Sequence, residues 1–314
     1  MRRLLCAVAL LGVAFAQKPQ LVGEFNVPDD ARAVLLAPDG KHIVVGTAPT
    51  KATLFDTVAK SKLRDLDSTD SAAAAAFSPD GSLLGVANQS GAFQVWSVAD
   101  GKLVQSGTTG KDVAHHVCFS PDNKRLALAA DSGAIRIFDT ATGKSVGPFN
   151  PPFGGTWGLT FSTDGTLATA DEDTNVRLWD RDGKLAHQIE YSLVAPFAVG
   201  FSGDGKTLVV GGAAKVVKVM DLATGKILKE FPTGRFVVRT LVLSPDSRYA
   251  AVQTMDQDGF RLTAPLQVWE IASGKKIFEM PSTIDASMAF DARSNLMVAN
   301  TKGNSAQLWS VALK

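Results

Sequence analysis

The sequence is poor in the residues that carry most catalytic and metal-binding chemistry. Its 314 residues include only two cysteines, Cys6 and Cys118, and four histidines. We expect Cys6 to be removed with an N-terminal leader, which leaves one thiol and excludes an internal disulfide. No glycine-rich phosphate loop and no serine nucleophile elbow occurs. A catalytic triad or a metal centre based on histidine therefore has few ways to form.

Long apolar runs are also scarce, and the single one stands at the N-terminus. Arg2 and Arg3 precede the run Leu4–Ala16, which ends in the small-x-small pattern Ala14-Phe15-Ala16. This pattern is typical of a secretory signal peptide, and the run is too short to span a bilayer core of about 30 Å. We predict a signal peptide over residues 1–16 and one domain over residues 17–314, exported to the periplasm or the extracellular space.

The chain has no excess or cluster of charge. It holds 32 basic and 31 acidic residues, and lysine and arginine are scattered along it. Nucleic acid binding depends on a basic patch, and no such patch is visible. We therefore expect neither a nucleic acid partner nor insertion into a membrane after removal of the signal peptide.

Two marks recur along the rest of the chain. The first is a turn of the Ser-Pro-Asp-Gly kind, as in Ser78-Pro79-Asp80-Gly81, preceded by one apolar residue that we call the marker residue. The marker residues recur every 40 to 47 positions, at Leu36, Phe77, Phe119, Phe161, Phe201, Leu243 and Phe290. The second mark follows 18 to 26 positions later, at Phe55-Asp56, Trp96-Ser97, Phe138-Asp139, Trp179-Asp180, Met220-Asp221, Trp269-Glu270 and Trp309-Ser310. This period is that of a four-stranded propeller blade.

On these marks the chain resembles the WD-repeat family, in particular its plainer exported bacterial members, over essentially all of residues 17–314. The sharpest copies are Val176-Arg177-Leu178-Trp179-Asp180 and Leu266-Gln267-Val268-Trp269-Glu270. One family feature is missing, because no copy has the Gly-His pair whose histidine joins a hydrogen-bonded set with an aspartate and the tryptophan. The resemblance implies an all-β, seven-bladed β-propeller with four-stranded antiparallel blades.

The residues agree with that fold. Proline and glycine in Ser-Pro-Asp-Gly suit a hairpin turn between the first and second strands, and runs such as Leu126-Ala127-Leu128-Ala129 are apolar on both faces, as in buried strands. Ala72–Ala76 favours a helix by propensity, but its register with the other first strands predicts a strand. The last blade lacks a fourth strand at its end, and we predict that Leu21–Phe25 supplies it and closes the ring.

We expect binding on the face that carries the connections from strand two to three and from strand four to one, which we call the top face. These connections vary between blades, whereas the turns of the opposite face are monotonous. Blade six has extra length over Met255–Ala264. The candidate partner-binding residues on the top face are Phe153, Trp157, Phe197, Arg235, Arg239, Asp256, Asp258, Phe260 and Arg261.

Two other groupings are weighed as metal sites and set aside. His115, His116 and Cys118 are close in sequence, but neighbouring residues of a strand point to opposite faces, and further ligands are missing. Asp256-Gln257-Asp258-Gly259 is similar to the start of a calcium loop without its later carboxylate. We expect no metal and no cofactor.

The leading hypothesis is a monomeric, non-catalytic, exported scaffold that binds a protein or peptide through its top face. An alternative is a propeller enzyme of lactonase or quinoprotein type, suggested by repeated segments such as Asp139-Thr140-Ala141-Thr142-Gly143-Lys144. A second alternative is glycan recognition, which requires Trp157 or Phe260 to be exposed to solvent.

Overall fold

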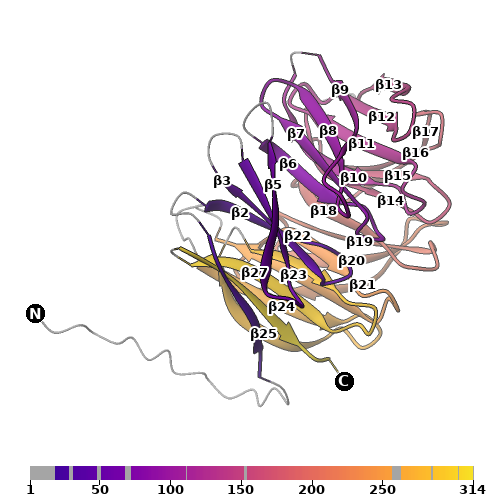
Figure 1. Cartoon of the computed structure of the whole chain (residues 1–314). Helices are drawn as coiled ribbons and strands as arrows, with labels where there is room; N and C mark the ends of the chain where they lie inside the picture. The colour runs from indigo at the N-terminus through magenta and orange to yellow at the C-terminus, as the bar shows by residue number, and fades with distance from the viewer. Residues whose placement is uncertain are drawn as a thin grey trace, which may run out of the picture.

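The structure is a computed structural model that describes residues 18–27, 31–47, 51–67, 72–110, 112–151, 154–256, 263–283, 286–302 and 304–313. These residues form 28 strands, which build seven four-stranded antiparallel sheets (Figure 1). The predicted seven-bladed β-propeller is confirmed. The predicted signal peptide lies outside the described residues. Within the described ranges, no helix has the length and apolar character needed to cross a membrane.

Each of the first six blades takes four consecutive strands. Blade one comprises β2 (Ala31–Leu36), β3 (His42–Thr47), β4 (Lys51–Asp56) and β5 (Ser61–Asp67). Blade two comprises β6 (Ala72–Phe77), β7 (Leu83–Asn88), β8 (Ala92–Ser97) and β9 (Leu103–Thr108). Blade three comprises β10 (Ala114–Phe119), β11 (Arg125–Ala130), β12 (Ile135–Asp139) and β13 (Ser145–Phe149). Blade four comprises β14 (Thr156–Phe161), β15 (Leu167–Asp171), β16 (Asn175–Trp179) and β17 (Leu185–Glu190). Blade five comprises β18 (Pro196–Phe201), β19 (Thr207–Gly212), β20 (Val216–Asp221) and β21 (Ile227–Pro232). Blade six comprises β22 (Val237–Leu243), β23 (Tyr249–Met255), β24 (Thr263–Glu270) and β25 (Lys275–Thr283).

The seventh blade combines the two ends of the chain. It comprises β26 (Ser287–Phe290), β27 (Leu296–Lys302), β28 (Ser305–Val311) and, as its fourth strand, β1 (Gln20–Asn26). β1 pairs antiparallel with β28, from Gln20 opposite Ser310 to Asn26 opposite Ser305, and in Figure 1 this indigo strand lies beside the yellow blade. The predicted ring closure by an N-terminal strand is confirmed.

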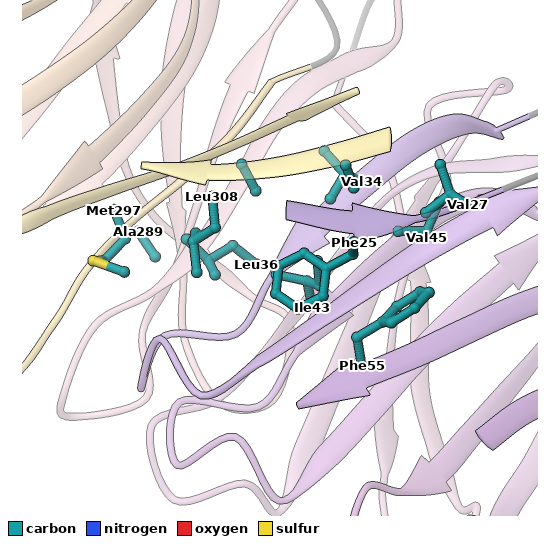
Figure 2. Close-up of a cluster of buried hydrophobic side chains, with 12 residues drawn as sticks. Phe25, Val27, Val34, Leu36, Ile43, Val45, Phe55, Ala289, Met297 and Leu308 are labelled. Carbon is teal, nitrogen blue, oxygen red and sulfur yellow. The ribbon is translucent and has the colours of Figure 1, made fainter. Parts of the chain in front are cut away.

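Apolar packing between the last and first blades reinforces the closure. Phe25 of β1 is buried in one cluster with Phe55 of β4 and Leu308 of β28, and Figure 2 shows the rings of Phe25 and Phe55 side by side. The two ring centroids lie 5.6 Å apart. Aromatic pairs at this separation add stability beyond the area that they bury.

The order of strands within a blade sets their burial. The first strands lie innermost, since those of neighbouring blades contact one another around the ring, as β6 contacts β10 and β14 contacts β18. The second strands are sandwiched between neighbouring blades, and every residue of β15 is buried. The fourth strands are outermost, with most side chains of β17 exposed. The alanine-rich segment Ala72–Ala76 forms the inner strand β6, as predicted.

The repeated turns are held by a serine and an aspartate. In blade three the Ser120 hydroxyl donates to Asp122 Oδ1 at 2.6 Å and accepts from the Arg125 amide at 2.9 Å. The next residue, Asn123, has φ 59°, in the left-handed region where other blades place glycine, such as Gly81 at 73°. The last residue of the turn is therefore in the left-handed conformation, which departs from type I geometry.

Candidate binding face of the propeller

Backbone hydrogen bonds between connections define the two faces of the ring. On one face, the Asp131 amide, in the turn from strand two to three, donates to the Val113 carbonyl in the connection from strand four to one, at 3.0 Å. On the other face, the Thr140 amide of a strand three-to-four turn donates to the Lys124 carbonyl of a strand one-to-two turn at 2.9 Å. The connections therefore group by face in the way that the sequence analysis expects, and the first face is the top face.

A β-bulge recurs near the top of the inner strands of blades one to six. In each of these strands the pairing skips one residue, and that residue stands four positions before the marker residue. A bulge redirects a side chain that would otherwise follow the alternation of the strand. The bulged residues are Arg32, Ala73, His115, Trp157, Phe197 and Arg239. Three of the predicted site residues, Trp157, Phe197 and Arg239, thus occupy equivalent positions in blades four, five and six.

Trp157, which is exposed, and Phe197, which is half-buried, form an aromatic pair. Their ring centroids lie 5.9 Å apart with an interplanar angle of 68°, which is an edge-to-face contact. Trp157 is nevertheless 46% exposed. The two strands approach closely because Gly158 follows the tryptophan, and a Cβ at that position would lie 2.7 Å from the Phe197 carbonyl oxygen. The pair is therefore positioned by the backbone and keeps a large apolar surface in solvent.

The connection from β17 to β18 adds two aliphatic side chains to this region. Leu193 is 91% exposed and Val194 is 41% exposed. The connection is anchored at its start by Tyr191, which is buried and whose hydroxyl donates to the Val216 carbonyl at 3.1 Å. Burial raises the pKa of the Tyr191 hydroxyl, with a smaller effect from Glu230, so the phenol stays neutral. We call Trp157, Leu193, Val194 and Phe197 the apolar patch.

The end of the connection is anchored by close backbone packing. A Cβ on Gly212, at the end of β19, would lie 2.4 Å from the Ala195 carbonyl oxygen. The Ala213 amide donates to that same carbonyl at 3.0 Å. Both ends of the connection are thus fixed, and Leu193 is presented to solvent by a braced segment.

Blade six places two arginines on the top face. Arg235 lies in the turn between β21 and β22, 59% exposed, with its guanidinium 5.1 Å from the Phe236 ring centroid and 3.8 Å from Asp256. Arg239 occupies the bulge of β22 and is exposed. The turn is braced by the Thr233 hydroxyl, which donates to the Phe236 carbonyl at 2.7 Å. The remaining predicted site residues, Phe153, Asp258, Phe260 and Arg261, lie outside the described residues.

A buried hydrogen-bonded network supports the backbone beside Trp157. Trp179 Nε1 donates to the Thr169 hydroxyl at 3.1 Å, and Thr169 donates to Asp171 at 3.1 Å. The Thr156 hydroxyl donates to the other oxygen of Asp171 at 2.9 Å. The chain has no Gly-His pair before its inner strands, and in blade four Gly155-Thr156 takes that place with a hydroxyl donor. Thr156 is the first residue of the inner strand β14.

Arg177 completes the network with two ion pairs. It contacts Asp171 at 2.7 Å and Asp173 at 2.5 Å, and both Arg177 and Asp171 are buried. Burial raises the pKa of Asp171 despite its bonds to Arg177 and the two threonines. The hydrogen bond from Arg177 lowers the pKa of Asp173. The segment Asp171–Asp173 is therefore partly a buried ionic cluster.

The two neighbouring histidines of blade three have different surroundings. His115 is exposed at the bulge of β10, with Nε2 2.8 Å from Asp131. His116 is partly buried, and burial together with the neighbouring His115 lowers its pKa to about 4. Burial raises the pKa of the Cys118 thiol. In the described part of the chain, no three His, Cys, Asp or Glu side chains gather in a way that could hold a metal ion.

Sequence reasoning missed two kinds of top-face residue. Leu193 and Val194 were not among the candidates, because their exposure depends on how a short connection is braced and no pattern in the sequence marks it. His115 was considered only as a metal ligand, although its spacing of four residues before Phe119 matches that of Trp157 before Phe161. The repeat period could therefore have identified the bulge positions.

The fold is a seven-bladed propeller whose top-face side chains at the bulges vary between blades. Residues 101–139 and 143–180 match the family model described as WD domain, G-beta repeat. These two segments are thus similar to WD repeats, within a chain that forms a seven-bladed β-propeller.

Among solved structures, the chain is similar to the β-propeller domain of Cps50 (Swd1) from Myceliophteria thermophila. The similarity covers 94% of this chain and 100% of that domain, with a TM-score of 0.77 and 14% sequence identity. At this identity the match speaks to the fold alone. No curated protein matches the sequence.

Proposed function

We propose that this propeller is a non-catalytic scaffold that binds a protein or peptide through the apolar patch on its top face. The observation that carries the proposal is the 46% exposure of Trp157, held edge to face against Phe197. Tryptophan and arginine dominate the energetics of protein interfaces, and both residue types stand at equivalent bulges, in blades four and six. Rigid inner strands carrying variable side chains are a suitable platform for recognition.

The exposure of Trp157 also meets the condition set for glycan recognition. Sugar sites, however, need hydrogen-bonding groups around the aromatic platform, whereas Leu193 and Val194 offer none. The aliphatic surroundings therefore favour an apolar side chain of a protein over a sugar ring.

The test compares matched single substitutions on the two faces of the ring. Leu193→Asp places a charge in the apolar patch, and Val58→Asp places one at a similarly exposed site, 77%, between β4 and β5 on the opposite face. Immobilised protein is exposed to a cell-envelope extract and retained proteins are identified by mass spectrometry. We expect partners retained by the wild type and Val58→Asp but lost with Leu193→Asp and Trp157→Ala.

Loss of a central hot-spot side chain costs at least about 2 kcal/mol in binding, or about 30-fold in affinity. Retention that is equal for all four proteins would reject the apolar patch as the binding site. Binding of the wild type to immobilised glycans, sensitive to Trp157→Ala, would instead support the glycan alternative.

We further propose that the chain is exported and acts as a monomer. The support for export is the run Leu4–Ala16 with its Ala14-Phe15-Ala16 ending. N-terminal sequencing of protein recovered from the envelope or the medium should begin at Gln17. Recovery of the intact chain from the cytoplasm alone would contradict export, and a dimeric mass by light scattering would contradict the monomer.

A further inference from the structure

The apolar patch lies between an acidic and a basic part of the top face. The inner strands β10, β14, β18 and β22 contact one another in sequence around the ring, so the bulged residues follow in the order His115, Trp157, Phe197 and Arg239. The two aromatic residues thus occupy the middle of a row that spans blades three to six.

Carboxylates stand on the side of blades three and four. Asp131 is 63% exposed and lies 2.8 Å from His115. Asp112, in the connection to β10, accepts hydrogen bonds from the hydroxyl and the amide of Ser132. Glu172 is exposed in the next blade and accepts from the Gly155 amide at 3.0 Å. In sequence, Lys111 is the one basic residue of these connections, and it lies outside the described residues.

Cations stand on the side of blades five and six. Arg235 and Arg239 are exposed on blade six, and Lys215 lies in the turn between β19 and β20. Asp256 is the one carboxylate described among them, 3.8 Å from Arg235.

We propose that the partner is an extended peptide segment with opposite charges at its two ends. In this segment one apolar side chain has a basic residue on one side and an acidic residue on the other. This inference rests on the proposed function. The apolar side chain packs on Trp157, Phe197 and Leu193. The basic residue faces Asp131 and Glu172, and the acidic residue faces Arg239 and Arg235. Because like charges facing each other across an interface cost affinity, the arrangement fixes the direction in which the segment lies.

The charged flanks act mainly on specificity and association rate. Each exposed ion pair contributes little to affinity, so the apolar anchor supplies most of it. Charge at the rim also makes association sensitive to salt. Raising the salt concentration should therefore slow association of the segment with the wild type.

The test is selection of a phage-displayed random dodecapeptide library on the folded, full-length mature chain. Peptides are kept when they bind the wild type and Val58→Asp but not Leu193→Asp. We expect them to share an apolar residue with a base on one side and an acid on the other. Synthetic peptides of this class should bind Arg239→Glu about fivefold to tenfold more weakly, and exchange of their acid for lysine should restore binding to that variant.

The outcomes separate the two proposals. Selected peptides that show no charge pattern, or that bind Arg239→Glu as tightly as the wild type, overturn the proposal of a segment with opposite charges at its two ends. The proposed function then still stands. A selection in which every peptide that binds the wild type also binds Leu193→Asp and Trp157→Ala, or a selection without any binder, counts against both proposals. Arg239 is exposed, so the folded state of its variant can be checked by an unchanged melting temperature.

Discussion

Arg177 and Asp171 form an ion pair in the interior of blade four. Arg177 Nη1 lies 2.7 Å from Asp171 Oδ2, and the two side chains are 1% and 0% exposed. Asp171 also accepts from Thr156, the residue directly before Trp157. A charge pair at the base of the apolar patch therefore holds the strand end that carries the exposed tryptophan.

Replacing Arg177 with methionine should lower the free energy of unfolding strongly. The substitution leaves the Asp171 carboxylate buried without its counter-charge, and removing one partner of a buried pair costs about 3–5 kcal/mol. Urea unfolding at pH 7 measures the change. Arg181→Met is the matched control, since Arg181 is exposed on the opposite face and its guanidinium donates to the Asp164 carbonyl. A loss below about 1 kcal/mol for Arg177→Met would contradict this account, because the pair would then be dispensable.

The ring closure gives a second prediction, tested on one strand. Phe25→Ala should destabilise the protein by about 3–5 kcal/mol, the usual cost of emptying a buried phenylalanine site, because Phe25 is buried against Phe55. Leu21→Ala, on the same strand but 47% exposed, should change stability by less than about 1 kcal/mol. Thermal and urea unfolding measure both. Equal, small effects would mean that β1 is not needed to hold blades seven and one together.

Much of the fold follows from the sequence because two marks repeat at a constant distance. The period outweighs local preference, and so Ala72–Ala76 is a strand despite its helical propensity. The ends of the chain are predictable for the same reason, since the last blade is one strand short and Leu21–Phe25 resembles the other fourth strands.

The details of the binding face were harder to predict. Any hydroxyl can donate to a buried carboxylate, so Thr156 in the place of histidine leaves no distinct signal. Arg177 could not be recognised as buried, because arginine in a strand is usually exposed. The exposure of Leu193 depends on bracing by Tyr191 and Gly212, which lie in different blades. Contacts between blades, and not the repeat, decide these features.

The repeated serine–aspartate turns predict acid sensitivity. Hydrogen bonds from Ser120, Ser162 and Ser202 are the largest cause that lowers the pKa values of Asp122, Asp164 and Asp204 below the ordinary 3.8. A carboxylate whose folded pKa is lowered contributes stability that is complete above its unfolded pKa and is lost as the pH falls through its folded value. The protein should therefore lose stability below about pH 4.

The serines allow this acid effect to be isolated. Replacing the three serines with alanine should weaken the dependence of unfolding free energy on pH between 4 and 2.5, while Ser106→Ala, on the outer strand β9, should leave it as in the wild type. Urea titrations at successive pH values measure the slope. Identical slopes for the triple variant and the wild type would show that the turn hydrogen bonds do not hold the aspartates ionised.

His116 should govern stability in a higher range of pH. Burial, with a smaller contribution from His115, lowers its folded pKa from 6.5 to about 4. Below pH 6.5 the unfolded chain takes up a proton at this position and the folded chain does not until about pH 4, so stability falls as the pH drops through that interval. His116→Gln cannot take up the proton, and its unfolding free energy should fall less between pH 6.5 and 4. The matched control is His187→Gln, an exposed histidine of β17, which should keep the wild-type slope. If His116→Gln also keeps that slope, then His116 is protonated in the folded protein and its burial does not disfavour the charge.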